Sequence, residues 1–230
     1  MATRHIAVIG AGAVGLSTAL CVQQAVPNAK ITLISDKFDE DTTSWGAGGL
    51  FRLDLDHHPK EEHGKIRQWA TDSWNRYSFL AHSDQAKKSG MFFVAGTVLY
   101  NVPKDAGYSL MSELSYDFHK LDGTQLKEMN PNVSHKYGYG FTSLLTHTET
   151  YLRWLLRQFL SQGGSVQCRK LTSLTQLEDG FDVVVNCCGL QAVELCQDKS
   201  MFPIMGHLIK VTLNIYQTCQ PVRNCVSKHA

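Results

Sequence analysis

The chain has no long uncharged hydrophobic run and no marked excess of charge of either sign. None of its apolar stretches approaches the roughly 18 residues that a membrane-spanning helix needs, so we expect no membrane segment. The formal net charge of the 230 residues is +1, which predicts no binding to nucleic acid or to an anionic membrane surface. Arg4 and His5 lead directly into an apolar segment without the layout of a cleavable signal peptide, so we expect a protein that is not secreted.

Cysteine motifs are also absent. The seven cysteines are an odd number, and no C-x-x-C occurs, which favours an intracellular protein with reduced thiols. His57, His58 and His63 stand close to Glu61 and Glu62, but the stretch is polar and has no H-E-x-x-H pattern. We therefore expect a solvated surface there and predict no metal site.

A glycine-rich segment, GAGAVG at residues 10–15, follows an apolar stretch at residues 5–9 that predicts a buried strand. Gly10 permits a tight turn, Gly12 lets a pyrophosphate approach the backbone, and Gly15 lets the next helix pack closely on the strand. The N-terminus of that helix offers unpaired N–H groups to phosphates.

A second strand is expected at residues 31–35, and Asp36 at its end can accept hydrogen bonds from a ribose. Strand, turn, helix, strand and acid follow one another in the order of a dinucleotide-binding unit. This order favours nucleotide binding over the alternative, in which the glycines merely pack a strand-to-helix turn. The glycines by themselves do not separate NAD from FAD.

Helices and strands alternate in the rest of the chain. We expect helices at residues 61–82, 124–129, 149–162 and 191–196, and strands at residues 91–100, 139–146, 165–169 and 182–186. The first of these helices carries an apolar stripe, typical of a buried helix face, formed by Ile66, Trp69, Ala70, Trp74, Tyr77, Leu80 and Ala81. Gly163 suits the end of a helix, and the valines at 183–185 predict a buried parallel strand.

This order predicts an α/β fold in which a Rossmann-like sheet is interrupted by an inserted domain. We expect a discontinuous nucleotide-binding domain at residues 1–55 and 140–211. A partial, mixed α+β substrate domain is expected at residues 56–139, and residues 212–230 form a divergent tail, so the fold is expected to be incomplete at the C-terminus.

Several blocks carry a family resemblance. They read AVIGAGAVGLSTA at residues 7–19, ISDKF at 34–38, DTTS at 41–44, RQW at 67–69, YLRWL at 151–155, DVVVNC at 182–187 and FP at 202–203. Together they resemble the D-amino-acid oxidase family, and most closely its D-aspartate oxidase branch, from about residue 4 to about residue 211. The resemblance implies that the Rossmann-like domain binds FAD, because residues 36–48 are similar to the flavin cradle of that family.

The resemblance also implies roles for individual residues. Asp36 and Lys37 would hold the adenosine ribose, Gly49 and Leu50 would lie near the isoalloxazine ring, and Leu171 would offer a backbone contact to adenine. Thr43 and Ser44 would meet the pyrophosphate by hydroxyl or backbone N–H. In the alternative, residues 42–44 simply cap a turn. The full predicted set of cofactor residues is Gly10, Gly12, Ala13, Val14, Gly15, Asp36, Lys37, Thr42, Thr43, Ser44, Gly49, Leu50 and Leu171.

The activity that the resemblance implies is oxidative deamination of a small D-amino acid, with D-aspartate and other acidic D-amino acids favoured. Molecular oxygen would be the second substrate, and the products would be a 2-oxo acid, ammonia and hydrogen peroxide. An acidic substrate calls for an arginine partner. The family's substrate-binding arginine and tyrosine are expected beyond the end of this chain, so we assign no catalytic residue. His147 and Tyr151 could approach a substrate, but no motif selects them.

Two alternatives stay open: a catalytically inactive FAD-binding protein of the same family, and an NAD-dependent dehydrogenase. The resemblance implies a peroxisomal location, but the last three residues, KHA, are not a peroxisomal signal, so a cytoplasmic location is also open. The chain departs from the family in reading WGAGG at residues 45–49 and in having Met205 where the family has an arginine.

Overall fold

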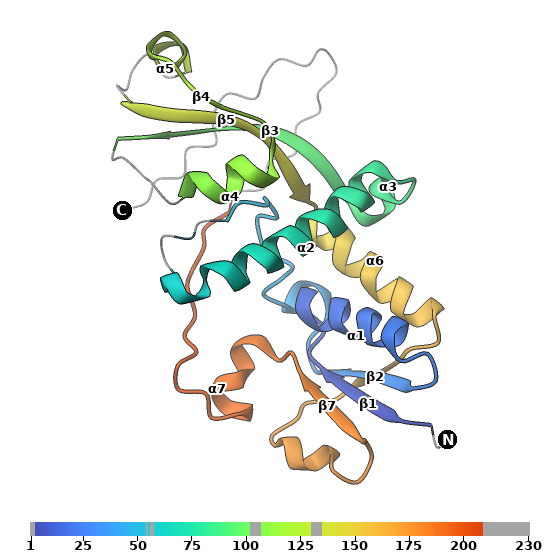
Figure 1. Ribbon diagram of the computed structural model, residues 1–230. Coiled ribbons are helices and arrows are strands. Elements are labelled where there is room, and N and C mark those ends of the chain that lie inside the picture. Colours follow the sequence, from blue (N-terminus) through green and yellow to red (C-terminus); the bar gives the residue numbers. More distant parts are fainter. Residues whose placement is uncertain (1–2, 54, 56–57, 102–106, 130–134, 209–230) are drawn as a thin grey trace. The chain divides into compact units, whose positions relative to one another are not determined.

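The structure, a computed structural model, describes residues 3–53, 55, 58–101, 107–129 and 135–208 (Figure 1). The chain divides into two compact units. The described residues of the first unit fall within 3–51, 74–93 and 144–208, and those of the second within 52–73 and 94–143. Compactness by itself assigns no role to a unit, so the expected division into cofactor and substrate domains stays a prediction.

The first unit contains a parallel sheet with the strand order β6-β2-β1-β7. Its strands are β1 (His5–Ile9), β2 (Lys30–Ser35), β6 (Ser165–Cys168) and β7 (Val183–Asn186). In β1 and β2 every residue after the first is buried, as expected for strands covered on both faces. The four strands predicted for this unit are therefore confirmed.

Helices and an irregular segment cover the two faces of this sheet. Helix α1 (Ala13–Ala25) packs on β1 and β2 and lies beside α6 (Thr148–Ser161), as Figure 1 shows. Leu177, in the short helix η3 (Leu174–Leu177), packs with Ala7, Ile9 and Ile34 in one apolar cluster. The Gly10 N–H donates to the Ile34 carbonyl at 2.8 Å, which ties the turn after β1 to β2.

The predicted end of α6 at Gly163 is confirmed. Gly163 has a φ of +85°, and its N–H donates to the Leu160 carbonyl at 3.0 Å. The N–H of Gly164 donates to the Phe159 carbonyl, also at 3.0 Å, which completes a glycine-terminated helix end. The remaining short elements of this unit are η1 (Asp39–Asp41), α3 (Ala86–Ser89), η4 (Gly189–Gln191) and α7 (Ala192–Leu195).

Strand β7 corrects one expectation. It is parallel to β1, as predicted, but Val183 is 41% exposed rather than buried. The reason is its place at one edge of the described sheet, where β1 is its only neighbouring strand among the described residues.

The second unit is built on a sheet with the strand order β3-β5-β4. The strands are β3 (Met91–Tyr100), β4 (Tyr116–Lys120) and β5 (Tyr137–Thr146), and the helices include α4 (Gly107–Leu114) and α5 (Gly123–Met129). Residues 91–93 of β3 and 144–146 of β5 belong to the first unit. Strands β4 and β5 are antiparallel, and Met111 of α4 is fully buried against Tyr139 and Phe141 of β5. The sequence did not predict α3, α4 or β4.

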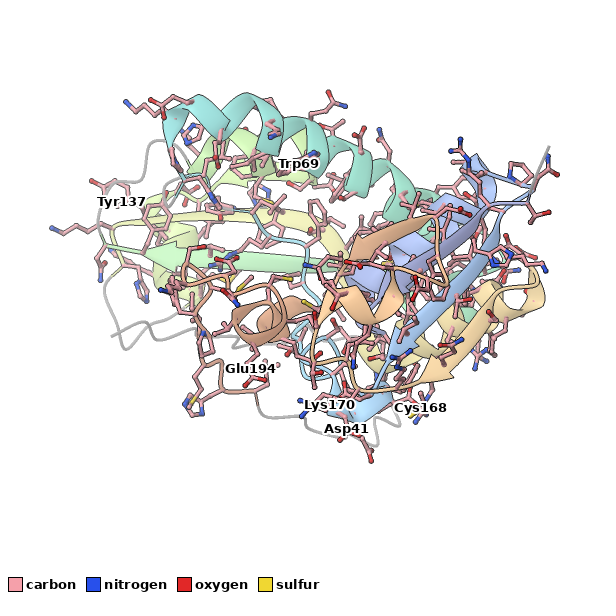
Figure 2. All side chains as sticks on the ribbon, turned by 90° about the horizontal axis from the view of Figure 1, so that it is seen from below. Asp41, Trp69, Tyr137, Cys168, Lys170 and Glu194 are labelled. Carbon is pink, nitrogen blue, oxygen red and sulfur yellow. The ribbon has the colours of Figure 1, made fainter. Side chains whose placement is uncertain are left out.

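Helix α2 (His63–His82) follows the short helix η2 (Lys60–Glu62). Ala70 and Trp74 are buried, as the apolar stripe predicts, but Trp69 is 59% exposed (Figure 2). Successive helical residues point about 100° apart, so Trp69 and Ala70 cannot share one narrow buried face. The Lys65 ammonium lies 5.2 Å from the centre of the Trp69 ring instead. No helix among the described residues is long and apolar enough to cross a membrane.

Candidate functional site

The turn between β1 and α1 leaves no room for side chains at two of its glycines. Gly10 has a φ of +101°, and a Cβ on it would overlap the carbonyl oxygen of Cys187, at the end of β7. A Cβ on Gly15 would overlap the carbonyl oxygen of Gly10. The backbone therefore closes tightly on itself and on β7, so that both positions require glycine.

The first turn of α1 lies directly after Gly12. The Ala13 N–H donates to the hydroxyl of Ser44 at 3.0 Å, and a Cβ on Gly12 would stand 3.0 Å from that same oxygen. Val14 is 69% exposed, whereas Gly15 and Leu16 are buried, so one side of this turn faces solvent. An exposed helix start with free N–H groups is suited to binding an anion.

Asp36 stands at the end of β2, beside the glycine turn. The Ser35 hydroxyl donates to the Lys37 carbonyl at 2.8 Å and accepts from the Lys37 N–H at 3.2 Å, which fixes the turn after the strand. The side-chain amide of Gln191 donates to Asp36 Oδ1 at 3.2 Å. Because β1, β2 and β7 are parallel, their carboxyl ends bring the glycine turn, Asp36 and Gln191 to one edge of the sheet.

Sequence reasoning missed Gln191. It lies 155 residues from Asp36 in the chain, and no motif selects a glutamine there. The available signal was topological: a parallel strand at residues 182–186 must deliver the residues that follow it to the same edge as the glycine turn.

The hydroxyls at residues 42–44 point to different partners. The Thr42 hydroxyl donates to the Asp39 carbonyl at 2.7 Å, so the turn-capping alternative describes Thr42. Ser44 reaches α1 instead, as described above, and Thr43 is exposed. Only Ser44 is thus joined to the glycine turn by a direct hydrogen bond among these three residues.

The loop after β2 is anchored to the start of α6. The Arg153 guanidinium lies 4.7 Å from the centre of the Trp45 ring, and its Nε is 3.7 Å from Asp39 Oδ1. The Thr148 hydroxyl donates to the Trp45 carbonyl at 2.9 Å. These contacts hold residues 39–45 beside the glycine turn without using the hydroxyl of Thr43.

The residues predicted to lie near the isoalloxazine ring, Gly49 and Leu50, and near the adenine, Leu171, come later in the chain than the glycine turn. Gly49 has a φ of +72°, and its carbonyl accepts from the Thr146 N–H at 2.9 Å. Leu50, 42% exposed, forms an antiparallel bridge with Leu145. The Leu171 side chain packs against the apolar cluster that contains Ile9 and Ile34, so its backbone runs close under the sheet.

Tyr151 and His147 have structural roles. Tyr151 is buried, and burial raises its pKa well above the usual tyrosine value. Its ring meets that of Tyr77 edge to face at 5.9 Å, and burial also raises the pKa of Tyr77. His147 Nδ1 accepts from the Thr150 N–H at 3.4 Å, which caps α6. That Tyr151 or His147 approaches a substrate stays a prediction.

Other candidate features lie away from the glycine turn. An open cavity of about 530 Å³ in the first unit is lined by α3, the start of β3 and the start of α6, including Lys87, Met91 and His147. Among the described residues no three His, Cys, Asp or Glu side chains come together to hold a metal ion. His57 lies outside the described residues. The five described cysteines are free thiols.

A parallel sheet, a glycine turn into a helix, and an acid after the second strand define the class: a dinucleotide-binding α/β protein. Sequence comparison narrows this class. The family model described as FAD dependent oxidoreductase matches residues 5–227. D-aspartate oxidase of Homo sapiens is 34% identical over 212 residues, which are 92% of this chain and 60% of that protein.

Two further curated relatives are also oxidases by name. D-aspartate oxidase 1 of Caenorhabditis elegans is 32% identical over 91% of this chain and 61% of its own length. D-amino acid oxidase of Dugesia ryukyuensis is 28% identical over 90% of this chain and 61% of its own length. The chain thus spans about 60% of the length of the curated relatives that it matches.

Solved structures share the fold. Glycine oxidase from Geobacillus kaustophilus superposes with a TM-score of 0.62 at 13% identity, covering 87% of this chain and 60% of that one. Iminodiacetate oxidase from Chelativorans sp. BNC1 gives a TM-score of 0.61 at 15% identity, covering 84% of this chain and 57% of that one. At these identities the likeness concerns the fold alone.

The chain belongs to the FAD dependent oxidoreductase family, the family of the D-amino-acid oxidases. The resemblance inferred from the sequence blocks is therefore confirmed, as is the α/β fold class. The alternative of an NAD-dependent dehydrogenase gains no support from these relatives.

Proposed function

We propose that this chain binds FAD at the carboxyl edge of its parallel sheet and serves the oxidation of D-amino acids, with D-aspartate favoured. The observation that carries the proposal is the glycine turn, where Gly10 and Gly15 exclude any side chain. The same edge carries the exposed first turn of α1 and the carboxylate of Asp36. In this proposal residues 1–55 and 140–211 form the cofactor domain and residues 56–139 the substrate domain.

The residues present fit a dinucleotide. Among the described residues, and apart from the neighbours of Gly12 in the chain, only the Ser44 side chain lies within 4 Å of where a Cβ on Gly12 would stand, so a pyrophosphate can approach the backbone there. The α1 N-terminus and the Ser44 hydroxyl would then meet its oxygens, because both carry hydrogen-bond donors. Asp36 would accept from the adenosine ribose, since a carboxylate can accept hydrogen bonds from adjacent hydroxyls.

FAD, when bound, supplies two-electron oxidation of an amine, with molecular oxygen as the final acceptor. The contribution of the chain is to bind and orient. Ser44 ties the loop of residues 36–50 to α1, and Arg153 holds the same loop through Trp45 and Asp39. Gly49 and Leu50 are held by pairing with the end of β5, which would fix them beside the flavin ring.

The substrate preference rests on the relatives. The D-aspartate oxidases of Homo sapiens and Caenorhabditis elegans are more similar in sequence to this chain than the Dugesia D-amino acid oxidase is. We therefore propose acidic D-amino acids ahead of neutral ones. A peroxisomal location is part of the same proposal, and imaging of the tagged chain with a peroxisomal matrix marker tests it.

The visible absorption spectrum of the purified chain, recorded before and after anaerobic addition of D-aspartate, tests the function. We expect a flavin spectrum that loses its absorption on addition of D-aspartate, more slowly with D-alanine, and not with L-aspartate.

The other outcomes separate the alternatives. Flavin that stays oxidised with every D-amino acid favours FAD binding without turnover and overturns the oxidase activity for this chain. A folded sample that neither retains nor takes up FAD overturns the cofactor assignment.

A further inference from the structure

We propose that Gln191 is a positioning residue for the adenosine ribose of FAD: it holds the Asp36 carboxylate by one oxygen so that the other faces the ribose hydroxyls. The inference rests on the proposed binding of FAD and deepens it. Its direct support is the hydrogen bond from Gln191 Nε2 to Asp36 Oδ1, which is 3.2 Å long and partly buried.

The contact spans the carboxyl edge of the sheet. Asp36 follows β2, Gln191 follows β7, and β1 lies between these strands. Neighbouring strands stand about 4.8 Å apart, so the side chains bridge roughly 10 Å. The strand between them ends in Gly10, and the Cys187 carbonyl packs on that glycine. The Gln191–Asp36 bond therefore crosses the edge of the sheet at the glycine turn itself.

The backbone that carries Gln191 is fixed by the residue that ends β7. Asn186 Oδ1 accepts from the Cys188 N–H at 3.1 Å, and Asn186 Nδ2 contacts Cys196 Sγ at 3.0 Å. The Gln191 N–H donates to the Cys188 carbonyl at 3.2 Å, and Ala192, the next residue, is buried. Gln191 thus projects from a segment held at both of its ends.

An unsupported carboxylate rotates about its terminal bond, and binding must then order it. A glutamine amide donates but carries no charge, so it orients Asp36 without neutralising it. The two carboxylate oxygens have about four acceptor sites, and Gln191 occupies one of them. The ribose hydroxyls consequently meet an acceptor that is already oriented, and preorganisation of this kind increases affinity.

Binding of FAD, ADP and FMN to the apoprotein, measured by flavin fluorescence and calorimetry, tests the role of Gln191. FAD and ADP contain the adenosine ribose, whereas FMN lacks it. We expect Gln191→Leu to raise the dissociation constants of FAD and ADP about tenfold, in line with the loss of one hydrogen bond to a charged group, and to leave that of FMN within about twofold. In the Asp36→Asn background the same substitution should have a smaller effect.

Glu194→Leu is the matched control, because Glu194 is an exposed polar residue on the adjoining helix α7 (Figure 2). It should leave the affinities for FAD and ADP unchanged. Gln191→Glu should lower the affinity for FAD more than Gln191→Leu does, because it places a second carboxylate next to that of Asp36.

The outcomes that contradict the inference are distinct. Gln191 has no ribose-positioning role if the Gln191→Leu variant binds FAD with the affinity of the wild type, or if its affinity for FMN falls as much as its affinity for FAD. In either case FAD binding by the wild type still stands. If the wild type binds neither FAD nor ADP, the proposed function fails and the inference fails with it.

Discussion

The two units of the chain bury their sheets in different ways. In the first unit β1 and β2 are buried along almost their whole length, by α1 on the sheet and by the cluster around Leu177. In the second unit most residues of β4 are exposed, and packing concentrates in aromatic side chains such as Tyr139 and Phe141 against Met111. The first pattern is typical of a parallel sheet and the second of an antiparallel one.

The predicted cofactor residues belong to only one of these two packing patterns. Every predicted cofactor residue lies in the first unit, and the glycine turn and Asp36 lie at the carboxyl edge of its doubly covered sheet. A site that depends on close backbone approach needs such a rigid frame, because a shift of the turn at Gly10 would also move the start of α1. The aromatic cluster of the second unit contains none of the predicted cofactor residues, so the two units should respond differently to substitution.

Replacement of Gly15 by alanine should have the largest effect. The new Cβ would overlap the Gly10 carbonyl oxygen, and backbone cannot move aside cheaply. We expect the free energy of unfolding to fall by about 3 kcal/mol or more and FAD binding to be lost, as measured by urea unfolding and flavin fluorescence.

Gly64→Ala is the control, since no atom of the described residues outside its own helix turn lies within 4 Å of the added Cβ in α2. It should change stability by about 1 kcal/mol or less, in the stabilising direction. Equal stability of the two variants would show that the turn is not under the steric constraint described.

A pair of core substitutions compares the units directly. Phe159 in α6 and Met111 in α4 are both fully buried. Phe159→Ala should cost about 3–5 kcal/mol and Met111→Ala about 2–5 kcal/mol in urea unfolding. Only Phe159→Ala should also lower the affinity for FAD, because α6 packs on α1, whose first turn borders the candidate site. Equal loss of FAD affinity in the two variants would contradict the assignment of the site to the first unit.

Alkaline pH should destabilise the first unit through its paired tyrosines. Burial raises the pKa of Tyr151 and of Tyr77 above the usual tyrosine pKa of about 10, so the folded state holds protons that the unfolded state releases above that pH. The contribution of these tyrosines to the free energy of unfolding is therefore fully present below that pH and falls as the pH rises beyond it.

Tyr151→Phe should make this fall shallower by about 1.4 kcal/mol per pH unit above pH 10, measured by urea unfolding at several pH values. Tyr137→Phe in the second unit is the control, because Tyr137 is exposed (Figure 2) and meets water in the folded and the unfolded chain alike. An identical pH dependence in Tyr151→Phe and the wild type would rule out this role for Tyr151.

The smallest expected effect is that of Ser44→Ala, which removes the acceptor of the Ala13 N–H. We expect a loss of about 1 kcal/mol in stability, the usual cost of removing a helix cap, and FAD binding weakened several-fold. Ser44→Thr keeps the hydroxyl and should restore both quantities. Thr124→Ala, at an exposed position of α5 in the second unit, should behave as the wild type, and a matching loss there would argue against a specific role for Ser44.

Local pattern was sufficient for much of the fold. The strands β1 and β2 are apolar runs bounded by glycine or turn residues, and Gly163 ends α6 through its own backbone geometry. Strand β4 was missed because its sequence, YDFHK, is largely polar, and only pairing with β5 makes it a strand. Trp69 was misplaced because spacing alone does not tell which edge of an apolar stripe meets the core.

In the candidate site, too, some features follow from local sequence and others only from the tertiary structure. The sequence by itself determined the glycine turn, because Gly10 takes a positive φ there and Gly15 packs on the Gly10 carbonyl within one strand–turn–helix segment. The carbonyl that crowds Gly10 belongs to Cys187, which only the tertiary structure brings to the turn. Only the tertiary structure decided that Ser44 caps α1 and that Gln191 holds Asp36. These partners lie 31 and 155 residues apart, and nothing local brings them together. Their contact depends on the parallel strands that deliver distant segments to one edge of the sheet.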